Sequence, residues 1–403
     1  MSHLTFYNQF KCPSVSASSF YCAIIQGITM KHIALTIFYF LLFLLQIKPT
    51  RSYKYNSIFS FGDSYTDTGN LNVYVLSKNL SISVNTDKWP YGETFFHHPA
   101  DRFSDGRLIL DFLAEEFGLP FVEPYLAKKG CFLRGANFAV AGATALDPTV
   151  LKQTSPAKSA IAALNTSLNF QLKWFKELKP SLCHERKECT KYFASSFFVV
   201  GEIGVNDYND MLISGLNVTQ VHHYVPKIVD TIANAIKGLI HEGARTLLVP
   251  GNVPMGCLPV LLTLEIDEHP SYDHSTGCNR KINMLSRYHN SLLLKAIKEL
   301  RLKYPHAKII YADYYKPLLN FVRFPKRYGF TSTPLRVCCG KGGKYNWNVN
   351  ELCGMPNVNA CQDPSKYIFW DGVHLTEAAY HYIFNSWLKG PYAQPPIQDG
   401  HLH

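Results

Sequence analysis

The sequence predicts a single α/β domain in which helices cover both faces of a parallel sheet. Short apolar runs alternate with longer amphipathic ones over residues 57–388, as expected for strands that alternate with helices. The run FFVV at residues 197–200 is continuously apolar, as strands buried on both faces are. Neither an internal repeat nor a long linker divides the pattern, so we expect one domain.

Hydrophobic spacing places the individual elements. Apolar runs predict strands at residues 57–61, 197–200, 246–249 and 307–311, and helical periodicity predicts helices at 104–117, 168–178, 221–240, 283–302 and 375–388. Ser104 or Asp105 is the expected N-cap of the first of these helices, and Gly118 is its stop. Residues 328–364 contain four cysteines and little periodicity, which predicts a disulfide-held excursion near the end of the sheet.

Composition argues against several classes of protein. The chain has 403 residues, 47% hydrophobic and 17% charged, so it can bury a large core and does not resemble a disordered chain. The formal charge of +10 comes from scattered Lys and Arg residues with no basic run of five, which argues against nucleic acid as a partner.

The N-terminal region has the features of a secretory signal. Residues 33–47 form an apolar run interrupted by Thr36 and Gln46 and preceded by Lys31 and His32. This run is shorter than the roughly 18 residues that a membrane span needs, and it matches the hydrophobic region of a signal peptide. The alternative is a signal anchor that stays in the membrane.

These features divide the chain into three parts. We expect residues 1–52 to be an N-terminal extension plus a signal peptide, with Met30 as the physiological start. Residues 53–390 are the expected folded domain, and residues 391–403 are expected to be a flexible tail. The mature protein is then secreted, to the extracellular space, the vacuole or the cell wall, with no stable membrane anchor.

The cysteines fit an oxidising compartment. Removal of residues 1–52 lowers the formal charge to about +6 and leaves nine cysteines, an odd count that predicts at least one free thiol. We expect the pairs Cys183–Cys189 and Cys257–Cys278 first, because each closes a short loop. The adjacent Cys338 and Cys339 are not expected to bond to each other, so one or both should pair with Cys353 or Cys361.

Three sequons also fit passage through the secretory pathway. Asn79, Asn165 and Asn217 each begin an N-x-S/T triplet and are candidate glycosylation sites.

Ser64 is the first candidate for chemistry. It lies in the segment FGDSYTDTGN, directly after the predicted strand at residues 57–61, where open parallel sheets place their sites. A serine in this place can equally be the N-cap of the next helix, so both interpretations stay open.

Asp371 and His374 lie three residues apart at the start of the last predicted helix, in FWDGVHLTEAA. One short loop can therefore present a carboxylate and an imidazole together, and a nucleophilic hydroxyl needs a base whose other ring nitrogen is held by an acceptor. The alternative is that Asp371 caps the helix and His374 is an ordinary, partly buried histidine.

A triad also needs donors for developing negative charge. Gly142 lies among small residues in NFAVAGATAL, where a backbone N–H can approach a ligand closely. Asn206, in GEIGVNDY, follows the strand at residues 197–200 in an expected loop, from which its amide can point to an oxyanion. A packing glycine and a turn asparagine are the alternatives.

Together these segments resemble a known family. FGDSYTDTGN, NFAVAGATAL, GEIGVND and DGVHLTEAAY, in this order, are similar to the blocks of plant GDSL esterase/lipases within the SGNH hydrolase superfamily, and the resemblance covers residues 55–388. It implies a three-layer α/β/α fold with a flavodoxin-like parallel sheet. GEIGVNDY and FFHHPADRFSDGR are similar to the branch that acts on small esters of specialised metabolites.

The resemblance also implies roles for the candidate residues. Ser64 is implied as the nucleophile, His374 as the base and Asp371 as the residue that orients the base. The backbone N–H of Ser64, together with Gly142 and Asn206, is implied as the oxyanion hole. At position 65 this chain has Tyr where the family name has Leu, a departure that bears on the shape of the pocket.

Other kinds of site fit the sequence less well. The serine context at residues 62–66 lacks the G-x-S-x-G of α/β-hydrolases, and GKGGK at residues 340–344 lacks the Walker pattern and predicts a glycine-rich turn. The adjacent pairs His97–His98 and His222–His223 present diverging side chains, and H-E-x-x-H does not occur. We therefore expect neither a metal nor a cofactor.

The sequence thus predicts a secreted, monomeric serine esterase that cleaves carboxylic esters through an acyl-enzyme, with small esters of specialised metabolites as substrates. The alternatives are a lipase that acts on longer acyl chains, an acyltransferase that uses the same acyl-enzyme, and a catalytically silent binding protein.

Overall fold

The structure is a computed structural model of the chain, and it describes residues 54–127, 130–154, 164–266 and 269–398. Lys54–His403 form one compact unit. The expected signal peptide and Met30 lie outside the described residues. In the ranges given above, no helix combines the length and the apolar character needed to cross a membrane.

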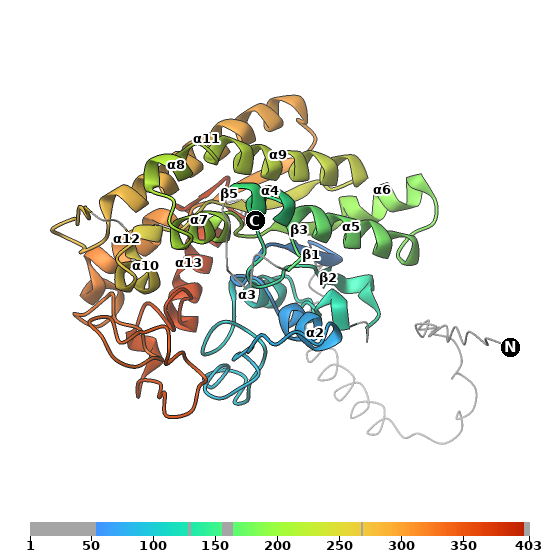
Figure 1. Cartoon of the computed structure of the whole chain (residues 1–403). Helices are drawn as coiled ribbons and strands as arrows, with labels where there is room; N and C mark the ends of the chain where they lie inside the picture. Colours follow the sequence, from blue (N-terminus) through green and yellow to red (C-terminus); the bar gives the residue numbers. More distant parts are fainter. Residues whose placement is uncertain (1–53, 128–129, 155–163, 267–268, 399–403) are drawn as a thin grey trace, which may run out of the picture. The chain divides into compact units, whose positions relative to one another are not determined.

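A six-stranded sheet lies at the centre of the compact unit (Figure 1). The strands are β1 (Ser57–Phe61), β2 (Gly135–Asn137), β3 (Ser196–Val200), β4 (Thr246–Pro250), β5 (Lys308–Ala312) and β6 (Ala393–Gln394). Their order is β2-β1-β3-β4-β5-β6, in which β6 is antiparallel to β5 and all other pairs are parallel. The order of the five parallel strands is that of flavodoxin, so the expected fold is confirmed.

Helices pack around this sheet. They are α2 (Asn70–Ser77), α3 (Ile109–Glu116), α4 (Pro148–Thr154), α5 (Leu168–Leu178), α6 (Arg186–Ala194), α7 (Val205–Ile213), α8 (Val218–His222), α9 (Val225–Glu242), α10 (Pro259–Thr263), α11 (Arg280–Lys303), α12 (Tyr315–Arg323) and α13 (Glu377–Lys389). Helix α9 packs with α5, α6 and α11, whereas α13 packs with α3 and α12 (Figure 1). Every residue of β1, β3 and β4 is buried, which explains why these strands have no polar face.

The start of α3 corrects a predicted boundary. This helix begins at Ile109 with Leu108 as its N-cap residue, not at Ser104 or Asp105. The carboxylate of Asp111 accepts a hydrogen bond of 3.0 Å from the Leu108 N–H. The carboxylate of Asp105 instead accepts one of 2.8 Å from the Glu377 N–H, in the first turn of α13. The expected local cap therefore stabilises a helix that is distant in sequence.

Two other predictions are corrected near the middle and the end of the chain. The segment predicted as one helix at 221–240 is two helices, α8 and α9, and Pro226 lies in the first turn of α9. Proline lacks the N–H that a helix interior needs, so α9 can begin here but α8 cannot continue through it. The tail expected to be unstructured forms β6 on the edge strand β5, and Ile397 beyond it is buried.

Four disulfides join pairs of described cysteines. They are Cys183–Cys189, Cys257–Cys278, Cys338–Cys361 and Cys339–Cys353. Both pairs expected first are confirmed, and so is the pairing of the two adjacent cysteines with Cys361 and Cys353. Cys131 is disulfide-bonded as well, so the predicted free thiol is not found among the described residues.

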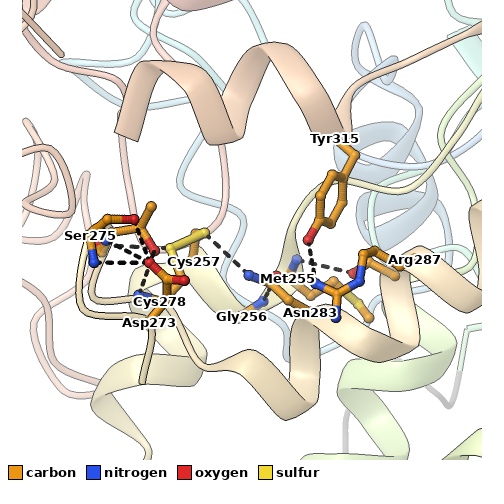
Figure 2. Close-up of a disulfide and its surroundings, with 11 residues drawn as sticks. Met255, Gly256, Cys257, Asp273, Ser275, Cys278, Asn283, Arg287 and Tyr315 are labelled. Atoms are coloured by element: carbon orange, nitrogen blue, oxygen red, sulfur yellow. Dashed lines mark hydrogen bonds between the residues drawn. A yellow bond between two sulfur atoms is a disulfide. The ribbon is translucent and has the colours of Figure 1, made fainter. Parts of the chain in front are cut away.

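The Cys257–Cys278 disulfide ties the loop after β4 to the start of α11 (Figure 2). Asn283 of α11 reinforces this link, since its Oδ1 accepts a hydrogen bond of 2.9 Å from the Gly256 N–H. Helix α10 follows directly, and its Val260 N–H donates a hydrogen bond of 3.0 Å to the carbonyl oxygen of Gly372. The disulfide therefore supports the backbone that separates Asp371 from His374.

Candidate active site

Ser64 lies in a turn directly after β1. Gly62 begins this turn with a φ of +134°, and a Cβ atom there would lie 2.7 Å from Thr66 Oγ1, so glycine is required. The Gln171 side chain hydrogen-bonds both the N–H and the carbonyl oxygen of Gly62 at 2.8 Å. The next helix, α2, has Gly69 as its N-cap residue. Ser64 is therefore not a helix cap, and the alternative interpretation of this serine is wrong.

His374 and Asp371 approach Ser64 from the loop before α13. The distance from Ser64 Oγ to His374 Nε2 is 2.7 Å. On the other side of the ring, His374 Nδ1 lies 2.9 Å from Asp371 Oδ1 and 2.8 Å from Oδ2. Thr376 caps α13, so Asp371 does not serve as the helix cap. Hydroxyl, imidazole and carboxylate thus form one continuous hydrogen-bonded chain.

The Asp371 carboxylate is held in its ionised form. Burial alone would raise its pKa, but the nearby His374 charge and hydrogen bonds from the His374 ring and from the N–H groups of His374 and Val373 together lower it. Both backbone bonds measure 2.8 Å and reach Oδ1. The loop between the two residues therefore gives His374 a fixed, negatively charged partner.

The backbone N–H groups of Ser64 and Gly142 are available to a ligand. Gly142 has a φ of +79°, a conformation that favours glycine, and it lines the same cavity as Ser64. Within the described part of the chain, the N–H groups of Ser64 and Gly142 donate no hydrogen bond. Such groups can donate hydrogen bonds to the oxyanion that would form on a carbonyl oxygen when Ser64 attacks the carbonyl carbon.

Asn206 reaches the site from the first turn of α7, not from a loop as expected. Its Nδ2 donates hydrogen bonds of 3.0 Å to Asp63 Oδ2 and to the Ala143 carbonyl oxygen. Both amide hydrogens are thus engaged, and Asn206 links the segments of Ser64 and Gly142. It can donate to an oxyanion only by sharing or exchanging one of these bonds.

Two buried carboxylates, neither of them among the residues predicted from the sequence, hold the site segments together. Asp67 accepts hydrogen bonds from the N–H groups of Gly69, Asn70 and Leu71 and, at 2.8 Å, from that of Ala141. Asp207 accepts bonds of 2.8 and 2.9 Å from the N–H groups of Ala145 and Leu146. Burial raises the pKa of Asp67 to about 6 and that of Asp207 to about 7. A signal was present, since both belong to the motifs that contain Ser64 and Asn206.

Asp63, which directly precedes Ser64, forms a pair of buried acids with Glu202. Burial raises the pKa of Asp63, whereas the pKa of Glu202 is raised well above its usual range by burial and by the adjacent Asp63 charge. Burial and the neighbouring Asp63 charge together favour a protonated, uncharged Glu202. Asp63 can then accept from Asn206 without placing two negative charges below the site.

Aromatic side chains surround the chain of hydrogen bonds, and neither Tyr91 nor Phe103 was a predicted site residue. The Tyr91 hydroxyl donates a hydrogen bond of 2.9 Å to Asp371 Oδ2. The Phe103 ring centroid lies 4.6 Å from that of His374. These rings shield the imidazole and the carboxylate from water, so the interactions between them are stronger than they would be in a solvated site.

A cavity of about 360 Å³ opens onto Ser64, His374, Gly142 and Asn206. Apolar residues dominate its wall and include Leu71, Ile82, Val84, Leu164, Trp347 and Leu352. Trp347 and Leu352 belong to the excursion at residues 328–364, which therefore forms part of the site. Among the described lining residues, Asp371 is the sole acidic side chain and His374 the sole basic one.

The histidine pairs lie apart from this cavity. His222 stacks on Tyr288 with ring centroids 4.2 Å apart, and His97 and His98 are exposed. Across the ranges that the structure covers, no three His, Cys, Asp or Glu side chains form a group able to hold a metal ion.

Similarity to known proteins extends over most of the chain. Residues 58–387 match the model of the GDSL-like lipase/acylhydrolase family. Two Arabidopsis thaliana proteins, each named as a GDSL esterase/lipase, are 48% and 46% identical to this chain; the alignments cover 86% and 87% of this chain and 88% and 94% of theirs. A crystal structure of phospholipase A1 from Streptomyces albidoflavus NA297 aligns over 82% of this chain and 99% of its own, with 12% identity and a TM-score of 0.32. By the family match and the two plant relatives, the chain belongs to the GDSL-like lipase/acylhydrolase family of carboxylic ester hydrolases.

Proposed function

We propose that this protein is a serine esterase in which Ser64 is the nucleophile, His374 the general base and Asp371 the residue that orients and stabilises the imidazole. The observation that supports this most directly is the unbroken chain from Ser64 Oγ through His374 to Asp371, with distances of 2.7 and 2.8 Å. This arrangement supports the proposal, because acyl transfer needs a base within hydrogen-bonding distance of the nucleophile and a carboxylate on the other side of the base.

The reaction follows from this geometry. Ser64 Oγ attacks the ester carbonyl carbon while His374 Nε2 takes the hydroxyl proton, and Asp371 stabilises the imidazolium. The N–H groups of Ser64 and Gly142 donate to the oxyanion, and Asn206 joins them when it exchanges one of its present acceptors. His374 then protonates the leaving alkoxide, which departs and leaves an acyl-enzyme. Water, deprotonated by His374, attacks the acyl-enzyme; the bond from the acyl carbon to Ser64 Oγ then breaks, His374 returns the proton to Oγ, and the acid is released.

The cavity favours small esters over long-chain lipids. Its volume of about 360 Å³ lies at the lower end of the roughly 300–1,000 Å³ typical of ligand pockets. The mostly apolar wall and the pairing of Asp371 with His374 suit an ester with little net charge. The relatives named as esterase/lipases are compatible with this class, and small esters of specialised metabolites are the substrates we propose.

We also propose that the protein is secreted after removal of residues 1–52. Disulfides persist in oxidising compartments, and four join described cysteines. Asn79, Asn165 and Asn217 are all exposed, as glycan attachment requires. Sequencing of the mature N-terminus and deglycosylation of the native protein test this part of the proposal.

A series of p-nitrophenyl esters tests the proposed activity. We expect turnover to be highest with acetate or butyrate and to fall as the acyl chain lengthens, because the cavity cannot enclose a long chain. Asp371→Asn should lower kcat by up to about 10⁴-fold through loss of the correct imidazole tautomer. Highest turnover on long acyl chains would overturn the substrate class but not the triad, whereas full activity of Asp371→Asn would overturn the triad.

A further inference from the structure

We propose that Tyr91 is a positioning residue that fixes the Asp371 carboxylate from outside its own loop and thereby holds the His374 ring in place. The inference rests on the serine esterase mechanism proposed above. Asp371 Oδ1 accepts hydrogen bonds from the N–H groups of Val373 and His374, and the His374 ring reaches both carboxylate oxygens. All of these donors belong to the short loop that contains Asp371 itself.

Tyr91 differs because it comes from a distant part of the chain. Its hydroxyl donates to Asp371 Oδ2 over 2.9 Å, across a sequence separation of 280 residues. A carboxylate held by its own loop alone can turn with that loop. A donor anchored elsewhere fixes the plane of the carboxylate relative to the rest of the domain, and so fixes the direction in which His374 points.

Tyr91 is packed in a buried cluster that two disulfides cross-link. The ring is 4% exposed and belongs to a buried cluster with Trp370 and the disulfide-bonded Cys338, Cys339 and Cys353. Its centroid lies 5.8 Å from the Trp370 ring in an edge-on contact, and the Trp370 carbonyl oxygen accepts a hydrogen bond of 2.7 Å from the Cys339 N–H. The two disulfides of the excursion therefore support both Tyr91 and the residue that precedes Asp371.

The contact also has an electrostatic consequence. Burial, together with the charge and hydrogen bonding of Asp371, raises the pKa of Tyr91 well above its usual range, so the phenol stays a donor wherever the enzyme works. A donor on Oδ2 draws charge away from the carboxylate and weakens its stabilisation of the His374 imidazolium. Removal of this hydroxyl should then strengthen that stabilisation and move the acid limb of the rate profile to higher pH.

Tyr91→Phe tests the proposal because it removes the hydroxyl and keeps the ring that lines the cavity. We expect kcat on p-nitrophenyl acetate to fall about 10-fold with little change in KM, the size expected for a lost hydrogen bond to a charged group. The acid limb of kcat/KM should move to higher pH. Tyr367→Phe is the matched control, since Tyr367 packs against the same cluster and has no hydrogen bond to Asp371 in the described structure.

A double-mutant cycle separates positioning from a general structural effect. In the Asp371→Asn background, Tyr91→Phe should cost less than about twofold in kcat, because a residue that acts through Asp371 has nothing left to position. An equal cost in both backgrounds, or a Tyr91→Phe enzyme with the parent kcat and pH profile, would overturn the proposal. Failure of the serine mechanism itself is recognised separately, as full activity of Ser64→Ala.

Discussion

The Tyr65 hydroxyl donates a hydrogen bond of 2.8 Å to the carbonyl oxygen of Val373. It joins the residue after Ser64 to the residue before His374, so the turn of the nucleophile and the loop of the base are held together directly. Tyr65 is buried and is absent from the described lining of the cavity. The departure from Leu at this position therefore affects the alignment of the triad and not the shape of the pocket.

Tyr65→Phe should destabilise the protein and slow the reaction. The change keeps the ring but leaves the carbonyl oxygen of the partly buried Val373 without its donor, which costs about 1 kcal/mol of unfolding free energy. We expect kcat to fall severalfold because the distance from Ser64 to His374 is less tightly fixed. Urea unfolding and steady-state kinetics measure the two effects, and a variant equal to the parent in both would show that the hydrogen bond has no role.

Loss of the Cys339–Cys353 disulfide should reduce activity as well as stability. Cys353 lines the cavity, and the Cys339 N–H donates a hydrogen bond to the carbonyl oxygen of Trp370, the residue before Asp371. The double variant Cys339→Ser, Cys353→Ser should lose roughly 2–4 kcal/mol of unfolding free energy and at least about tenfold in kcat under conditions where it stays folded.

The matched control is the double variant Cys183→Ser, Cys189→Ser. That disulfide joins residues near α6, away from the described lining of the cavity. It should cost stability and leave kcat within about twofold of the parent. Equal losses of kcat in the two double variants would contradict a specific link between the excursion and the triad.

His289 should make stability depend on pH. The His289 ring is buried, and its Nδ1 lies 2.7 Å from the Tyr208 hydroxyl oxygen. Burial lowers the pKa of His289 to about 3. The unfolded chain takes up a proton near pH 6.5 while the folded protein does not, so this contribution to stability is present above that pH and is lost as the pH falls. Between pH 7 and pH 4 the loss should amount to about 3 kcal/mol. His289→Gln should show a smaller fall over this range in urea unfolding, and an unchanged fall would exclude His289 as the cause.

The sequence was sufficient for the fold class and for the residues that meet at the site. The buried strands β1, β3 and β4 contain runs of adjacent apolar residues, and the candidate residues follow strand ends or precede a helix, where local spacing is informative. Short β6 has no such run, because it lies on the sheet edge and is recognisable only by its pairing with β5. Asp105 was predicted to cap α3 because it lies just before that helix. Its local sequence does not show that its carboxylate accepts from the first turn of α13 instead.

Long-range contacts account for what the sequence did not reveal about the site. Tyr91 and Asp371 are 280 residues apart, and nothing in the neighbourhood of Tyr91 marks it as a partner of a carboxylate. The Tyr65 contact with Val373 spans 308 residues and was equally hidden. The Asn206 side-chain amide donates to two acceptors that belong to other segments of the chain. Its hydrogen bonding could therefore be seen only in the folded structure.

Ser64→Ala tests the proposed mechanism most directly. The variant removes one oxygen atom from a turn that Gly62 and Gln171 hold in place, so its unfolding temperature should equal that of the parent protein. We expect the folded variant to lose nearly all hydrolysis of p-nitrophenyl acetate and all labelling by a fluorophosphonate, which reacts with an activated serine. Hydrolysis of p-nitrophenyl acetate at the parent rate by folded Ser64→Ala would contradict the assignment of Ser64 as the nucleophile.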